Sequence, residues 1–175
     1  MVLIVEDGTG KADAQAYGSI ADADAYLASV GRDGDATNPW TGFSEPEKEE
    51  FILNGTVYLD DEYRSILDGS KRTKEQALQF PRVNVALDGG FTLDSDEIPA
   101  KLKNADFESA LLFSLGIDPH ADVTDFGNLS RKKIVIGPLT IDKAWSPPAS
   151  AQAVRQRIQK LMADFVVDQD KVIRA

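Results

Sequence analysis

Apolar residues recur at helical spacing in several separate stretches of this chain. Side chains three or four positions apart lie on one face of a helix, so such spacing marks a helix with one buried side. The pattern predicts helices over about 20–29, 45–63, 99–115 and 150–167. A fifth, shorter helix is predicted at 74–80.

Helix start and stop signals agree with these ranges. Ser19 is a good N-cap for the first helix, and Ser44 with Glu47 forms a capping box for the second. Pro99 suits the first turn of the third helix, and Gly116 is a plausible C-terminal stop. The boundaries of these three helices are therefore predicted from local chemistry alone.

The short helix at 74–80 is predicted from local signals of the same kind. Thr73 and Gln76 are spaced as a capping box, and Pro81 would end the helix because the residue before proline avoids the helical region. The segment is therefore expected to form one or two helical turns.

The helix at 99–115 is apolar around much of its circumference, which favours a central position. Gly55 in the second helix would permit a close helix contact, and the last helix carries a clean apolar stripe. That stripe consists of Val154, Ile158, Leu161 and Phe165.

Residues 131–142 break the helical pattern and predict two short strands about the Gly137-Pro138 turn. The expected fold is mainly α: a small bundle of about four to five helices with a short β-hairpin and a C-terminal helix or arm. We expect residues 1–145 to form the bundle, with the hairpin at about 131–142, and residues 146–175 to form the C-terminal helix and arm.

Composition narrows the class of protein. A chain of 175 residues that is 42% hydrophobic can bury a core. It has no apolar run near the roughly 18 residues that a membrane span needs. The N-terminal Met-Val-Leu-Ile-Val run is too short for a signal peptide, so we expect function without membrane crossing. The absence of cysteine removes disulfides, thiolate nucleophiles and zinc–thiolate sites.

Charge is distributed unevenly along the chain. Residues 1–70 contain 4 basic and 15 acidic side chains, a net of −11, and residues 71–175 contain 15 basic and 14 acidic, a net of +1. Together they give the net charge of −10. Nucleic-acid binding draws on Lys and Arg that neutralise phosphates, so the overall charge opposes general affinity for single-stranded DNA.

Candidate chemical motifs are incomplete. His120 is the single histidine, and nothing in the spacing brings it a nucleophile or an acid, so a solvated loop histidine is the expected role. Asp118 and Asp122 lie two positions before and after His120, so the three residues could hold a metal ion weakly. Acidic residues at alternate positions are, however, common in loops. The acidic runs at 6–7 and 94–97 lack the ligand ladder of a calcium loop.

Two glycine turns, at 8–11 and 68–71, contain fragments of a phosphate-binding loop without its full spacing. The chain also lacks the Gly-x-Ser-x-Gly elbow of serine hydrolases. We therefore predict no catalytic residues, no cofactor and no metal site, and a protein that is not an enzyme.

One basic run, at 131–133, leads directly into an apolar strand. Two interpretations remain open: a solvated strand start, or a projecting hairpin that a neighbouring subunit or another protein covers by strand addition. Trp40 and Trp145 both lie in predicted loops. A tryptophan in a loop can pack back onto the core or anchor an interface with a partner, and both roles remain open for these two residues. The candidate partner-contact residues are Arg131, Lys132, Lys133, Ile134, Val135, Ile136, Leu139, Ile141 and Trp145.

Several segments carry a family resemblance. They are Met1 to Gly10, Ser19 to Tyr26, the Arg72 to Leu115 stretch and the Gly137-Pro138-Leu139 segment. The chain resembles a family of small tailed-phage and prophage proteins, encoded among head–tail joining genes and also called DnaT-like single-stranded-DNA-binding proteins. The likeness covers most of the chain and is looser over 30–70 and after 145.

The resemblance implies a virion structural protein, a head–tail connector adaptor of the head-completion type. Such an adaptor is a homo-oligomer, expected as a dodecameric ring of twelve copies in the neck beneath the portal protein. It continues the DNA channel toward the tail terminator or another neck protein, and double-stranded DNA passes without sequence-specific binding. The expected location is the virion, with the host cytoplasm during assembly, and no membrane partner.

The family's other label implies a different function. A DnaT-like replication accessory would bind single-stranded DNA, which calls for basic grooves and stacking aromatic rings. An acidic channel lining would instead repel phosphates and let DNA slide. A third alternative is an enzyme accessory or inhibitor with no chemistry of its own.

Overall fold

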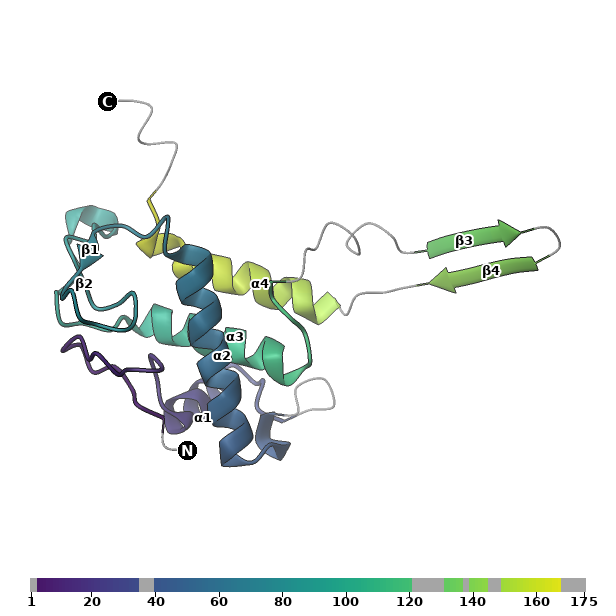
Figure 1. Cartoon of the computed structure of the whole chain (residues 1–175), viewed down its shortest axis with the longest axis horizontal. Helices are drawn as coiled ribbons and strands as arrows, with labels where there is room; N and C mark the ends of the chain where they lie inside the picture. The colour runs from purple at the N-terminus through teal and green to yellow at the C-terminus, as the bar shows by residue number, and fades with distance from the viewer. Residues whose placement is uncertain (1–2, 35–39, 121–130, 137–138, 145–148, 168–175) are drawn as a thin grey trace, which may run out of the picture.

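Four α-helices and two small antiparallel sheets make up the described part of the chain. The computed structural model describes residues 3–34, 40–120, 131–136, 139–144 and 149–167. The helices are α1 (Ile20–Ser29), α2 (Glu45–Tyr63), α3 (Ala100–Ser114) and α4 (Ala149–Met162). The mainly α fold with a short hairpin is confirmed (Figure 1).

The first three helices begin and end close to their predicted positions, and the expected capping boxes form on α1 and α2. Ser19 and Asp22 close a capping box on α1, and Ser44 and Glu47 close one on α2. Pro99 is the N-cap residue of α3, and Gly116 follows this helix with a φ of +68°. A left-handed glycine just past a helix end is the usual C-terminal stop.

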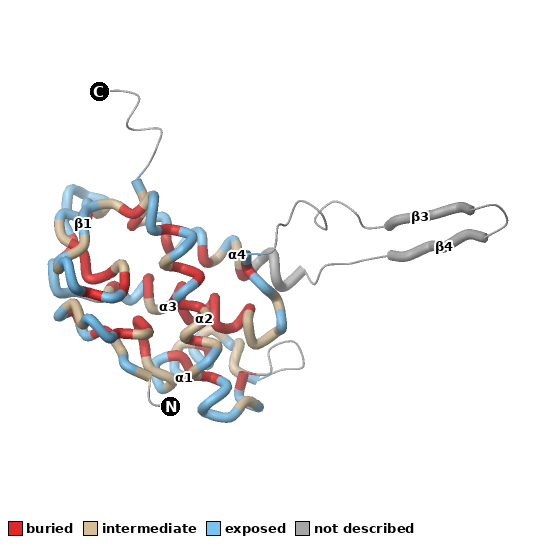
Figure 2. Tube along the Cα trace, viewed as in Figure 1, coloured by how far each residue is buried: buried red, intermediate tan, exposed pale blue. Residues whose placement is uncertain are grey.

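Helix α3 is the central element, as its apolar circumference predicts, and it packs against both α2 and α4. Every residue from Ala105 to Leu112 is buried (Figure 2). Gly55 makes the predicted close contact between α2 and α3. Among the described residues, no helix combines the length and the apolarity that crossing a membrane requires.

Helix α4 ends earlier than predicted, at Met162, and a 3-10 turn, η3 (Ala163–Phe165), follows it. Val154, Ile158 and Phe165 of the predicted stripe are buried, together with Met162. These side chains share one core cluster with Leu102 and Leu112 of α3. The division at residue 145 stays a prediction, and the described part of 146–175 contributes to this common core.

The helix predicted at 74–80 is wrong, although its capping contacts form. The Gln76 amide N–H donates to Thr73 Oγ1 at 3.2 Å, and the Thr73 amide N–H donates to Gln76 Oε1 at 2.8 Å. The chain then turns without continuing as a helix. The next amide groups donate to tertiary partners instead: Gln79 to Asp60, and both Gln79 and Phe80 to the Tyr17 hydroxyl.

Short strands flank this turn. Strand β1 (Ser70–Lys71) pairs antiparallel with β2 (Arg82–Val83), and a 3-10 turn, η2 (Asp88–Gly90), follows. The N-terminal segment is extended, with Val5 bridging to Ala16. Another 3-10 turn, η1 (Trp40–Gly42), places Trp40 in the core, where its indole N–H donates to Asp24.

Candidate nucleic-acid interface

The predicted hairpin at 131–142 forms, as strands β3 (Arg131–Ile136) and β4 (Leu139–Ala144). Figure 1 shows this ribbon standing away from the helical body. The ribbon contains every predicted partner-contact residue except Trp145. Trp145 and the Gly137-Pro138 turn lie outside the described residues.

The strand register assigns residues to the two faces of the ribbon. Lys132 pairs with Lys143, Ile134 with Ile141, and Ile136 with Leu139. Directly paired residues and alternate positions along a strand share a face. One face therefore combines four aliphatic positions with two lysines.

The other face carries Arg131 and Lys133, with Asp142 opposite Lys133. Lys143 was missing from the sequence-based candidates, although counting alternate positions along the second strand would have found it. The ribbon thus holds four basic residues and one acidic residue.

Many basic side chains of the helical body are engaged in holding the fold. Arg32 and Arg157 both contact the buried carboxylate of Glu108, at 2.7 and 2.9 Å. Lys48 donates to Asp24 at 2.9 Å, and Arg82 donates to three backbone carbonyls between Leu67 and Gly69. These cations are therefore poorly placed to neutralise phosphates.

The glycine turn at 8–11 does not act as a phosphate loop, because a carboxylate of the chain itself fills it. Buried Glu6 accepts the amide N–H groups of Gly8 and Gly10 through Oε1 and that of Lys11 through Oε2, at 2.8 to 2.9 Å. The interpretation as a turn is confirmed. Three amides that could have cradled an anion are already satisfied.

A second polar cluster lies between α2, α3 and the loop after Ala14. The Tyr17 hydroxyl donates to Asp60 Oδ1, and the Gln79 amide donates to Asp60 Oδ2 at 3.0 Å. Burial raises the pKa of Asp60 to about 6, against the lowering effect of these two donors. Burial likewise raises the pKa of Asp106 well above its usual range. The cluster organises the loop before Pro81, because Tyr17 and Asp60 accept the backbone amides of Gln79 and Phe80.

His120 is exposed, as predicted, and its ring lies edge-on to Tyr58 with centroids 5.0 Å apart. Its amide donates to Asp118 Oδ1 at 2.8 Å, which closes a local turn. Asp122 lies outside the described residues. Within the described ranges, no group of three or more His, Cys, Asp or Glu side chains is arranged to hold a metal ion.

These observations define a small helical protein with a β-ribbon rich in basic residues. The chain matches a family model described as "Putative DnaT-like ssDNA binding protein" over residues 1–175, and it belongs to that family. No curated protein and no solved structure matches it. The family match agrees with the single-stranded-DNA-binding alternative, whereas the head–tail connector has no support from these comparisons and stays a prediction.

Proposed function

We propose that this protein binds single-stranded DNA and that the β3–β4 ribbon is its contact surface. The observation that carries the proposal is the basic composition of the ribbon beside an acidic helical body. Arg131, Lys132, Lys133 and Lys143 lie within 14 residues, whereas residues 1–70 have a net charge of −11. DNA approaching the ribbon meets positive charge and keeps its distance from the acidic body.

Electrostatics sets the expected strength of binding. The strands β3 and β4 contain no aromatic residue, so they offer no ring for base stacking. Affinity for DNA then depends on the release of counterions from the DNA phosphates, which up to four basic side chains of the ribbon would neutralise. Each phosphate neutralised on a single strand contributes about −0.7 to the slope of log K against log salt. A slope of about −2 to −3, with little sequence preference, is expected.

Fluorescence anisotropy of a labelled oligothymidylate tests the proposal across a series of salt concentrations. The triple variant Arg131→Ser, Lys132→Ser, Lys133→Ser should bind at least about tenfold more weakly and with a shallower salt slope. The matched control removes three exposed cations from the body: Arg64→Ser, Lys74→Ser, Lys160→Ser. Equal losses in both variants, or no binding by the native chain at low salt, would contradict the proposal.

The head–tail connector is the second proposal, favoured by the acidic N-terminal half. A negatively charged channel lining would repel the DNA backbone and let a genome slide. Its test is mass photometry of the protein alone and with a portal protein. A ring of about a dozen copies or a discrete portal complex supports it, and deletion of residues 131–142 should weaken that assembly. A monomer that ignores the portal contradicts it.

A further inference from the structure

Two aromatic rings are exposed on the described part of the chain, and they belong to Phe91 and His120. An exposed ring is a platform on which a nucleic-acid base can stack, and such stacking tolerates any base. Phe91 is an unfavourable platform for DNA, because it lies between Asp88 and Asp94 and residues 83–100 contain no basic side chain. His120 is therefore the better candidate for a contact with a base.

The loop that carries His120 is fixed to the helical body at several points. Pro119 is buried, and the His120 amide N–H donates to Asp118 Oδ1 at 2.8 Å. The imidazole ring packs against buried Tyr58 of α2, with an angle of 79° between the ring planes. Such an edge-to-face pair covers at most one face of the imidazole. A base can therefore stack on a ring whose position the fold has already set, which lowers the cost of binding.

A guanidinium group lies next to this loop. Arg155 of α4 donates from Nη2 to the Asp118 carbonyl oxygen at 3.0 Å. Burial raises the pKa of the Tyr58 hydroxyl, Glu62 raises it further, and Arg155 lowers it. Both charged side chains therefore lie near the ring that supports His120. Among the described residues, Arg155 forms no ion pair and its Nε has no hydrogen-bond partner, so its charge is not used to hold that part of the fold together.

The cluster formed by His120, Tyr58 and Arg155 lies close to both chain connections of the β3–β4 ribbon. His120 stands eleven positions before Arg131, and Arg155 stands eleven positions after Ala144, which are the outer residues of the ribbon. Figure 1 shows the start of α4 on the side of the body from which the ribbon projects. One exposed ring and one guanidinium group are therefore continuous with the proposed DNA contact surface.

We propose that this cluster binds one nucleotide of the single strand that the ribbon holds. The base stacks on the open face of the His120 imidazole, and an adjacent phosphate pairs with the Arg155 guanidinium. The inference rests on the DNA-binding function proposed above and adds a contact of a different kind, since the strands of the ribbon contain no aromatic residue. Stacking contributes affinity that salt does not screen, whereas the phosphate contact is salt-dependent.

Fluorescence anisotropy with a labelled oligothymidylate tests the stacking contact, at about pH 8.5, where an imidazole is ordinarily neutral. His120→Ala should weaken binding about five- to tenfold without changing the slope of log K against log salt. His120→Phe should bind as tightly as the native chain, because a ring is again present. Phe91→Ala is the matched control, at a ring that is 72% exposed, and should leave the affinity unchanged.

A strand of the same length that lacks its bases separates stacking from other effects of the substitution. The native and His120→Ala proteins should bind this abasic sugar–phosphate strand equally, because it offers no base to stack on the ring. A loss that is as large on the abasic strand as on oligothymidylate would overturn the stacking contact. Failure of His120→Phe to bind better than His120→Ala would overturn it as well.

The salt dependence of binding tests the phosphate contact. Arg155→Gln should make the slope of log K against log salt shallower by about 0.7, the contribution of one phosphate on a single strand. Lys74→Gln removes an exposed cation elsewhere on the body and should leave the slope unchanged. Equal slopes for Arg155→Gln and the native chain would overturn the role of Arg155.

The outcomes also separate this inference from the proposal on which it rests. If the triple ribbon variant binds weakly while His120→Ala and Arg155→Gln bind as the native chain does, the nucleotide site is overturned and the ribbon stays the contact surface. If the native chain does not bind oligothymidylate at low salt, both proposals are overturned.

Discussion

Gly55 on α2 lies against Asp106 on α3 so closely that a Cβ at position 55 would come within 2.8 Å of the Asp106 carbonyl oxygen and 2.9 Å of its Oδ1. The same atom would lie 2.9 Å from the Ala110 amide nitrogen. Two of these neighbours are backbone atoms of the central helix, which cannot move without disturbing the whole bundle. The spacing of α2 from α3 therefore depends on this glycine.

Gly55→Ala should destabilise the protein by about 1–3 kcal/mol, because overpacking at a rigid helix contact outweighs the better helix propensity of alanine. Urea unfolding followed by circular dichroism measures the change. Gly42→Ala is the control, since a Cβ at position 42 meets no atom within 4 Å. Similar stability of both variants would show that α2 and α3 can separate freely.

Glu108 is fully buried and joins three parts of the fold. It accepts hydrogen bonds from Tyr26 on α1, Arg32 after α1 and Arg157 on α4. Glu108→Ala should cost about 3 kcal/mol, since it leaves two arginines without their shared partner. Asp164→Asn, which removes the charged partner of exposed Lys101, should cost less than about 1 kcal/mol. Chemical unfolding of the two variants under one condition makes the comparison.

The raised pKa of Asp60 predicts that the stability of the protein depends on pH. Its folded-state pKa is about 6 against an ordinary value of 3.8, so folding favours the protonated form. Asp60 therefore contributes to the free energy of unfolding in full below about pH 4, where it is protonated in both the folded and the unfolded state. This contribution is lost as the pH rises through 6. The difference corresponds to about 3 kcal/mol at most.

Asp60→Asn isolates this contribution. The variant loses one acceptor for Tyr17 or Gln79 and starts less stable at low pH, but its free energy of unfolding should change less between pH 4 and pH 7. Subtracting the two pH profiles removes the contribution of all other groups. Parallel profiles for native and variant proteins would contradict the elevated pKa of Asp60.

Glu6 fixes the N-terminal loop by accepting three backbone amides. Glu6→Ala should leave those three amides exposed to water or buried without a hydrogen-bond partner. The free energy of unfolding should fall by about 2–4 kcal/mol in total. Hydrogen exchange at Gly8, Gly10 and Lys11 should accelerate well beyond that at the α3 core. Asp7→Ala, at an exposed neighbouring carboxylate that bonds Thr9, should leave Gly10 and Lys11 protected.

Local chemistry in the sequence determined most of the secondary structure. The ranges of α1 and α2 follow from Ser19 and Ser44, since a cap satisfies the first free amides of a helix with side chains only three residues apart. The ribbon was predicted in the same way, from a basic start, a run of β-branched apolar residues and a Gly-Pro turn. The basic character of the candidate DNA-binding surface is therefore a property of the sequence alone.

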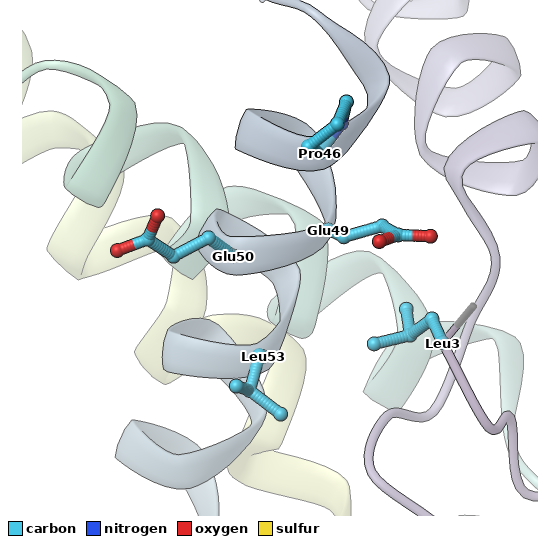
Figure 3. A pocket seen from close by; sticks show the side chains of 5 residues that line it. All are labelled: Leu3, Pro46, Glu49, Glu50 and Leu53. Atoms are coloured by element: carbon cyan, nitrogen blue, oxygen red, sulfur yellow. The ribbon is translucent and has the colours of Figure 1, made fainter. Parts of the chain in front are cut away.

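The tertiary structure decided what distant residues do to one another. Thr73 and Gln76 form their capping contacts, yet no helix follows, because Tyr17 and Asp60 take the amides of Gln79 and Phe80 and replace the helical hydrogen bonds. A surface hollow likewise brings Leu3 of the N-terminal segment close to Leu53 of α2, fifty positions away (Figure 3). Caps and periodicity act over a few residues, whereas grooves and buried carboxylates depend on which segments the folded core brings together.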